Sequence, residues 1–269
     1  MIKVHANDLP QDVSEFLSEY QGEVDAGASY SDRVDLARRL FGSRNDKRNP
    51  AFAAVRSALH SLCRGPGRCM YCEDSAADEI EHFYPKNLYP EFTFAWANYL
   101  YSCGPCNGPK SQWFAVFSAA TGQIIEVARS PRADVLPPEA GDPLYIDPRR
   151  EDPMEFLRLD LRDTFHFRPL GARDTRAYDR AEYTIRKLHL NDRDDLCVMR
   201  KDAFENYAAV LFAYVKGKQA GLTEAQLAPK LAKIRRAPHP TVWFEMKRQR
   251  DHHPRLRALF TAAAEALEW

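Results

Sequence analysis

The sequence predicts a mainly α-helical protein with a small, metal-stabilised segment between two helical regions. Apolar residues recur every three or four positions before residue 62 and again from residue 173 onward, which is helical spacing. Between these regions, the segment 63–118 is rich in cysteine, proline, glycine, asparagine and aromatic residues. Four of its cysteines form two C-x-x-C pairs, a pattern that indicates bound metal in a cytosolic protein.

The composition excludes several classes of protein. The chain has 269 residues, and 45% of them are hydrophobic, which is enough for a sizeable core and excludes global disorder. No apolar run approaches the ~18 residues that a membrane-spanning helix needs, and the first ten residues lack a secretory signal pattern. The 38 basic and 38 acidic residues sum to zero, which excludes a uniformly polybasic nucleic-acid binder. We therefore expect a soluble, cytoplasmic protein with no membrane partner.

The N-terminal region, 1–62, is predicted to be helical. Ser31 is a candidate N-cap for a helix that ends near Leu40, and a further helix is expected over 51–62. The segment 119–150 is rich in proline, which is typical of a connector between two regions.

The C-terminal region, 151–269, is predicted to be mostly helical after a small hairpin. Leucine and phenylalanine alternate with polar residues over 156–167, which predicts two short strands. Farther along, Thr223 and Gln226 form a capping-box pattern that begins a helix. The last two helices are expected to start at prolines, Pro240 and Pro254.

Four cysteines in the middle segment have the spacing of a zinc site. Cys69 and Cys72 form the first C-x-x-C pair, and Cys103 and Cys106 form the second. Four thiolates make the tetrahedral ligand set that zinc prefers. Because all four positions are then filled by protein, the sequence predicts a structural zinc with no open position for substrate.

Between the cysteine pairs, Glu81 directly precedes His82. Zinc deaminases also combine zinc, histidine and C-x-x-C, but they need a His-x-Glu motif. Here Phe83 and Tyr84 follow the histidine, and four cysteines leave no place for a metal-bound water, so the deaminase interpretation fails. A thioredoxin-like role also fits poorly, because two cysteine pairs in a segment rich in proline, glycine and asparagine do not resemble a strand–helix redox site.

The order of motifs over 69–110 resembles that of the HNH endonucleases, which have the ββα-metal (His-Me finger) fold. Their zinc-bearing members run C-x-x-C, acidic-His-x-x-Pro, aromatic-x-Asn and C-x-x-C-Asn-x-x-Lys, and this chain has every element in that order. Looser motifs at 146–148 and 183–191 are similar to those of the PtuB-type HNH proteins. Those proteins are the nuclease partners of an ABC-type ATPase in Septu and certain retron antiphage systems. The resemblance implies a mainly α protein with an inserted ββα-metal nuclease core.

The resemblance also implies a role for each motif residue. His82 matches the general base that deprotonates the attacking water, and an imidazole titrates near neutral pH. Glu81 and Asn107 match the ligands of a catalytic divalent ion, Mg²⁺ or Mn²⁺, which prefers oxygen donors. Asn98 matches the asparagine that holds the loop behind the base. Lys110, about one turn beyond Asn107, is placed to steer a phosphate.

Positive charge for a phosphate backbone is scarce over 69–110. This segment contains six acidic residues but only two basic ones, Lys86 and Lys110. Both lysines are as compatible with a solvated surface as with phosphate contacts. The stretch 230–257 is basic, which is compatible with a solvated surface, with nucleic-acid binding and with docking of an acidic partner. Its arginines of greatest interest are Arg235, Arg236, Arg248 and Arg250.

Together, these features predict a metal-dependent endonuclease that hydrolyses phosphodiester bonds in DNA. RNA, including tRNA, is an alternative substrate on the same chemistry, because a one-metal HNH site acts on a phosphate rather than a sugar. A zinc-organised module that binds nucleic acid or a partner without catalysis is the other alternative, but it would need neither the acidic-His pair nor the motif asparagines. The chain has no G-x-x-x-x-G-K-[ST] motif, so if it belongs to a triggered system, sensing must come from another protein. The resemblance implies a PtuA-like ABC-type ATPase as that partner.

Overall fold

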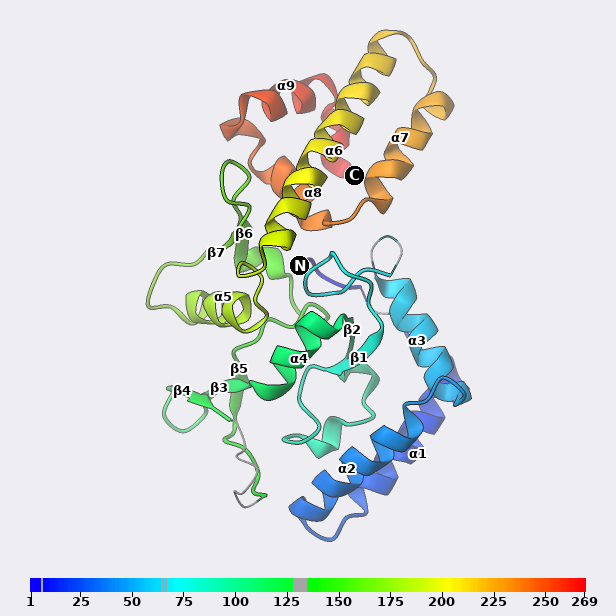
Figure 1. Cartoon of the computed structure of the whole chain (residues 1–269), viewed down its shortest axis with the longest axis vertical. Helices are drawn as coiled ribbons and strands as arrows, with labels where there is room; N and C mark the ends of the chain where they lie inside the picture. The colour runs from blue at the N-terminus through cyan, green and yellow to red at the C-terminus, as the bar shows by residue number, and fades with distance from the viewer. Residues whose placement is uncertain (6, 64, 66, 128–134) are drawn as a thin grey trace.

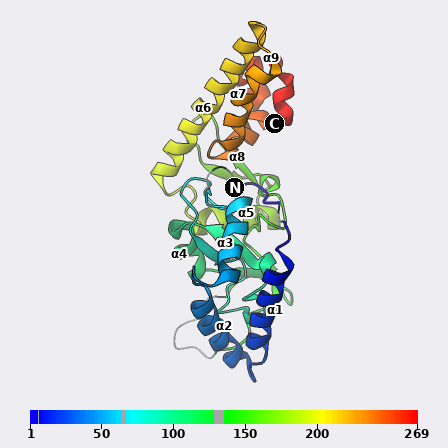
Figure 2. The same ribbon diagram turned by 90° about the vertical axis from the view of Figure 1, so that its right-hand side faces the viewer.

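Helices occupy both ends of the molecule, and short strands lie between them (Figure 1). A view turned by 90° shows the same division, with α1 to α3 at one end and α6 to α9 at the other (Figure 2). The computed structural model describes residues 1–5, 7–63, 65, 67–127 and 135–269. The mainly α character expected from the sequence is confirmed. Among the described residues, none of the helices combines the length and the apolar character needed to span a bilayer.

The N-terminal region forms three helices, α1 (Gln11–Asp25), α2 (Tyr30–Arg44) and α3 (Pro50–Leu62). The N-cap of α2 is Ser29 rather than Ser31. The Ser29 side chain accepts a hydrogen bond from the backbone N–H of Asp32, and the Asp32 carboxylate accepts one from the backbone N–H of Ser29. This reciprocal pair satisfies two groups at the helix start, which Ser31 inside the first turn cannot do.

The middle segment contains two antiparallel strands followed by a helix, which are β1 (Glu79–His82), β2 (Tyr99–Ser102) and α4 (Gly104–Gln112). In the register of the pair, Glu81 lies opposite Leu100 and His82 lies opposite Tyr99. The helix α4 begins directly after Cys103, which is its N-cap residue. The second cysteine pair therefore fixes the start of this helix beside the strand that carries the acidic-His motif.

The connector expected over 119–150 contributes strands to a sheet. This sheet has the order β4-β3-β5 and consists of β3 (Ala115–Ser118), β4 (Ile124–Glu126) and β5 (Gly141–Pro143). The expected boundary after residue 118 falls at the end of β3, while both partner strands lie beyond it. The short, mostly exposed strands β4 and β5 lack the apolar alternation that would have marked them in the sequence.

The C-terminal region has the hairpin and helices that the sequence predicts. The hairpin pairs β6 (Leu157–Leu159) with β7 (Phe167–Pro169). The helices are α5 (Arg176–Lys187), α6 (Asp194–Gln219), α7 (Glu224–Arg236), α8 (Pro240–Arg248) and α9 (Pro254–Ala262). The capping box of Thr223 and Gln226 at the start of α7 is confirmed, and α8 and α9 begin at the expected prolines. Short 3-10 turns, η1 to η5, lie at Pro90–Phe92, Trp96–Asn98, Pro153–Glu155, Arg250–His252 and Ala264–Glu268.

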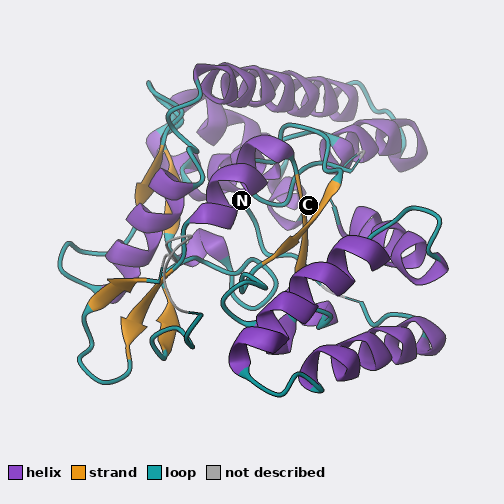
Figure 3. Cartoon of the chain, turned by 60° about the horizontal axis from the view of Figure 1, so that its bottom comes forward, coloured by secondary structure: helices purple, strands orange, loops and turns teal. Residues whose placement is uncertain are grey.

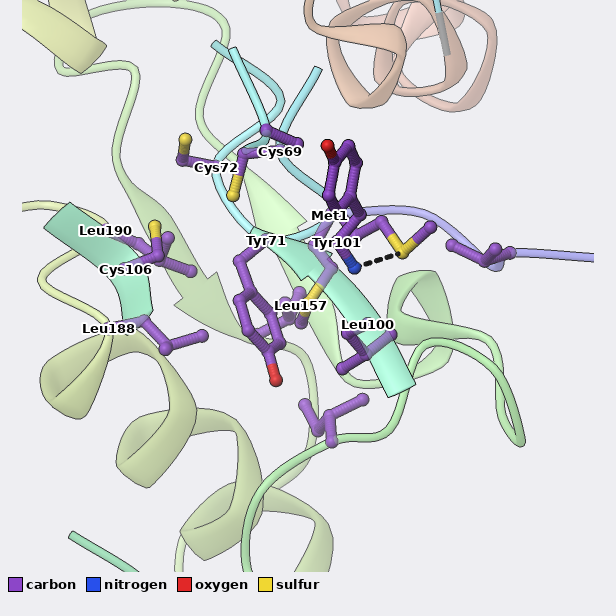
Figure 4. Close-up of a cluster of buried hydrophobic side chains, with 14 of the residues drawn as sticks. Met1, Cys69, Tyr71, Cys72, Leu100, Tyr101, Cys106, Leu157, Leu188 and Leu190 are labelled. Atoms are coloured by element: carbon purple, nitrogen blue, oxygen red, sulfur yellow. Dashed lines mark hydrogen bonds between the residues drawn. The ribbon is translucent and has the colours of Figure 1, made fainter. Parts of the chain in front are cut away.

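One connected set of buried apolar side chains extends from α1 through the strands to α9. Figure 3 shows strands among the helices near the middle of the molecule and other strands at its edge. Near β2, this core brings Tyr71 and Leu100 together with Leu188 and Leu190, which follow α5 (Figure 4). The N-terminal and C-terminal helices therefore pack on the middle segment through a shared core.

Candidate functional site

The four cysteines predicted to bind zinc converge in the structure. Their sulfur atoms all lie within 4.8 Å of one another, all four side chains are buried, and none forms a disulfide. The Sγ atoms of Cys72 and Cys103 are 3.8 Å apart. A tetrahedral ion with Zn–S bonds of about 2.3 Å places its ligand sulfurs about 3.8 Å apart. The donor set and its spacing therefore fit a structural zinc, and Figure 4 shows Cys69, Cys72 and Cys106 grouped beside Tyr71.

Residues of the C-terminal region contact Cys106 of the second cysteine pair and Glu73, which directly follows the first pair. The Arg193 side chain donates a hydrogen bond from Nη2 to Cys106 Sγ at 3.3 Å. On the other side, the carboxylate of Glu73, next to Cys72, accepts hydrogen bonds from the backbone N–H and the hydroxyl of Thr241 in α8. Four thiolates and a divalent ion carry a net charge of −2, so the guanidinium offsets part of that charge.

His82 is buried at the end of β1, with 5% of its surface exposed. Its Nε2 lies 2.9 Å from the carbonyl oxygen of Thr93. Its ring packs edge-on against the ring of Phe41, with the two ring centroids 4.4 Å apart. A carbonyl oxygen only accepts, so Nε2 carries the proton and Nδ1 is the basic nitrogen of the neutral ring. Burial, followed by the charges of Lys86 and Lys110, lowers the pKa of His82 well below its ordinary value of 6.5.

Both carboxylate oxygens of Glu81 have partners. Its Oε1 lies 2.8 Å from Lys110 Nζ, and its Oε2 accepts a hydrogen bond of 2.8 Å from the Tyr71 hydroxyl. A carboxylate has about four lone-pair sites, so these two contacts leave sites for an ion. Contacts of this kind orient a metal-binding carboxylate from behind.

Lys110 is placed differently from the expectation that it steers a phosphate. Its side chain is fully buried, and its Nζ donates to the carbonyl oxygens of His82 at 2.7 Å and Phe83 at 2.5 Å, besides its pairing with Glu81. Burial lowers the pKa of Lys110, and the charge of Glu81 opposes this shift. Three oxygens enclose this ammonium inside the core, so it cannot reach a substrate. Lys110 instead joins α4 to the end of β1.

Asn98 fixes the loop between β1 and β2. Its Oδ1 accepts a hydrogen bond of 2.7 Å from the backbone N–H of Tyr84, and its Nδ2 donates to the carbonyl oxygens of Tyr84 and Phe92 at 3.0 and 2.9 Å. Phe92 lies next to Thr93, whose carbonyl contacts the His82 ring. These hydrogen bonds connect Asn98 to backbone groups at two positions of the loop.

Asn107 lies in the first turn of α4, directly after Cys106, and is half-buried. Its Nδ2 donates a hydrogen bond of 2.5 Å to Glu79 Oε2. Because Nδ2 makes this contact, Oδ1 is the amide atom that is left to bind a hard cation. Glu79 itself is exposed and lies two residues before Glu81 on the same face of β1.

Three of the predicted residues meet at one hollow. Glu81, His82 and Asn107 line a cavity of about 90 Å³, together with Ile80, Pro85, Lys86 and Asn87. The hollow thus combines a carboxylate, an amide and an imidazole with a depressed pKa. Carboxylate and amide oxygens suit Mg²⁺ or Mn²⁺, and a neutral imidazole can accept a proton at pH 7.

The basic stretch at 230–257 is not one free surface. Arg248 pairs with Glu245, which is buried, and donates to the carbonyl oxygens of Met154 and Leu157. Its guanidinium therefore holds α8 to the turn before β6. Arg235 and Arg236 on α7 are exposed and keep the surface position expected for them.

Three contributors to the site were missed in the sequence. Glu79 could have been found from strand alternation, since it shares a face with Glu81. Tyr71 and Arg193 carried no local signal, because their partners lie 10 and 87 positions away along the chain.

Comparison with known proteins gives one partial similarity. A segment of 48 residues is 46% identical to the Septu protein PtuB of Bacillus thuringiensis. The match covers 16% of this chain and 19% of that protein, so the shared segment is about a fifth of the relative's length. No protein-family model and no solved structure matches the chain.

Proposed function

We propose that this chain is a metal-dependent endonuclease of the HNH type that hydrolyses phosphodiester bonds in DNA. The observation that carries the proposal is the convergence of His82, Glu81 and Asn107 on one hollow. Two antiparallel strands followed by a helix position them, and the candidate zinc site joins the start of that helix to the segment before β1. A binding module held by zinc alone would need neither a buried base nor these two oxygen ligands.

In this proposal, Glu81 and Asn107 hold Mg²⁺ or Mn²⁺ through Oε and Oδ1 atoms. When bound, the ion supplies stabilisation of the negative charge that develops on the phosphate and on the leaving 3′ oxygen. Lys110 and Tyr71 keep the Glu81 carboxylate in one orientation, so the ligand is in place before substrate binds.

His82 acts as the general base. Its Nδ1 removes a proton from a water whose oxygen attacks phosphorus, and the bond between phosphorus and the 3′ oxygen breaks. The leaving oxygen takes a proton from solvent, which gives a 5′ phosphate and a 3′ hydroxyl. The Thr93 carbonyl holds the reactive tautomer, and Asn98 holds the loop that presents this carbonyl.

The test is a cleavage assay on supercoiled plasmid DNA and on total RNA, with EDTA or with Mg²⁺. We expect the wild-type chain to cut plasmid with Mg²⁺ and not with EDTA, and His82→Ala to be inactive while it melts as a folded protein. The control His252→Ala changes an exposed histidine in η4 and should cut normally. Cleavage confined to RNA would establish the alternative substrate, and cleavage of neither would overturn the proposal.

We further propose that the nuclease serves antiphage defence together with a PtuA-like ABC-type ATPase. The short similarity to PtuB and the missing P-loop motif support this partner. Co-purification of the two proteins from one host tests it, with the variant Arg235→Glu/Arg236→Glu as a probe of the exposed face of α7. Separate elution of the wild-type chain and the ATPase would contradict the partnership.

A further inference from the structure

A nucleic-acid backbone at the hollow needs positive charge, and Lys110 cannot supply it from inside the core. Glu79 and Glu81 add negative charge on the same face of β1. Of the described residues that line the hollow, Lys86 is the one lysine or arginine. Among the described lining side chains, Lys86 is therefore the one cation that can contact a phosphate in the hollow.

Lys86 is held by an N-terminal helix. Its Nζ lies 5.0 Å from the ring centroid of Phe41 in α2, and that ring contacts the His82 ring at 4.4 Å. A cation over an aromatic face is attracted by the ring, so Phe41 keeps the ammonium beside the base. The helix α2 thus packs against the site through Phe41, although the acidic-His motif lies about forty residues later in the sequence.

Arg38 stands next to this arrangement on the same helix. An α-helix turns by about 100° per residue, so Arg38 lies about 60° from Phe41, whereas Arg39 lies about 160° away on the opposite side. Both arginines are exposed. Burial lowers the pKa of Lys86, and the charges of Arg38 and Lys110 act in the same direction against that of Glu81. Arg38 and Lys86 are therefore close enough for their charges to repel each other.

We propose that Arg38 and Lys86 form a phosphate clamp that holds the substrate backbone against His82. The clamp rests on the proposed nuclease function and assigns a substrate-binding role to the N-terminal helices. A phosphate between the two cations replaces their repulsion with two charge-assisted contacts. The clamp contacts the phosphate, which DNA and RNA share, so it gives no preference for a base sequence.

The test measures binding of labelled duplex DNA, single-stranded DNA and RNA of one sequence by fluorescence anisotropy. All proteins are the full chain with His82→Ala, which prevents cleavage. In this background, Arg38→Gln is compared with the matched control Arg39→Gln at salt concentrations between about 50 and 200 mM. The slope of log K against log salt is negative, and loss of one phosphate contact should reduce its magnitude by about 0.9 on duplex DNA and about 0.7 on single strands. The same loss weakens binding about fivefold at 0.15 M salt. A second variant, Lys86→Gln, should act similarly, and Arg39→Gln should leave slope and affinity unchanged.

Each result has one interpretation. An unchanged slope in Arg38→Gln, an equal change in Arg39→Gln, or no binding by any variant overturns the clamp. Cleavage by the chain with native His82 is measured separately, so the nuclease proposal survives such a result if plasmid is cut. Conversely, a reduced slope in a chain that cuts neither DNA nor RNA keeps the clamp and rejects the nuclease.

Discussion

Lys110 and Glu81 form an ion pair of 2.8 Å inside the protein, where neither side chain is more than 3% exposed. The pair joins α4 to β1, and Lys110 extends the connection to the carbonyl oxygens of His82 and Phe83. One ammonium thus contacts both the backbone at His82, the proposed general base, and the carboxylate of Glu81, the proposed metal ligand.

Replacing Lys110 with methionine should destabilise the protein strongly. The variant leaves Glu81 buried without its cation, which costs about 3–5 kcal/mol of unfolding free energy. Urea denaturation measures the loss, with Lys201→Met on the exposed face of α6 as the control, expected within about 0.5 kcal/mol of wild type. Adding Glu81→Gln should recover part of the loss, because it removes the unpaired charge. Equal stability of Lys110→Met and wild type would show that the pair contributes nothing.

The pH dependence of cleavage should reflect the lowered pKa of His82. Only the neutral imidazole accepts a proton, so activity is present above that pKa and is lost as the pH falls through it. Burial and the charge of Lys86 lower the pKa, and a divalent ion at Glu81 acts in the same direction. The acid limb of kcat/KM should therefore lie below pH 6.5 and move to higher pH in Lys86→Met. An acid limb above pH 6.5 in the wild type would contradict this assignment.

Loss of one cysteine ligand should cost both zinc and folding. Zinc binding supplies about 10–16 kcal/mol in small structural sites, so Cys106→Ser should lose the ion and melt at a lower temperature. The control Cys197→Ser changes a half-buried cysteine in α6 that lies outside the cluster. Elemental analysis and thermal melting provide the measurements. A wild-type protein without zinc, or unchanged melting of Cys106→Ser, would reject the structural site.

Arg193 should control how firmly the zinc is held. Removing the N–H···S contact in Arg193→Gln leaves Cys106 in place but withdraws a positive charge from the cluster. Metal affinity should fall about 10-fold or more, which release of zinc to a chromogenic chelator measures. Arg186→Gln, an exposed change near the end of α5, is the control. Identical metal affinities in the two variants, measured by competition with the chelator, would mean that Arg193 does not stabilise the site.

The sequence predicted those parts of the site that depend on local spacing. The C-x-x-C pairs predicted that four sulfurs lie around one point, and the acidic-His motif predicted a carboxylate and a histidine side by side at the end of a strand. The capping box at Thr223 and the prolines at the starts of α8 and α9 were also visible, because these signals act within one helical turn.

The sequence could not predict which of the two motif lysines is buried. Spacing places Lys110 one turn beyond Asn107, but its direction depends on Glu81 and on carbonyl groups 27 and 28 residues away. The approach of Phe41 to His82 likewise depends on how α2 packs, and no local pattern encodes it. Such contacts arise from tertiary packing. The strands β4 and β5 were not predicted for a related reason, because they are defined by their pairing with β3 rather than by a local pattern.

The central claim, that His82 is the base of a phosphodiester hydrolase, is tested most directly by single-turnover cleavage of supercoiled plasmid with Mg²⁺. His82→Ala should cut about 10²–10⁴ times more slowly than the wild type, because the water loses its general base. Added imidazole, which fits the space left by the ring, should restore part of the rate to His82→Ala and leave the wild type unaffected. A wild-type rate in folded His82→Ala would contradict the account.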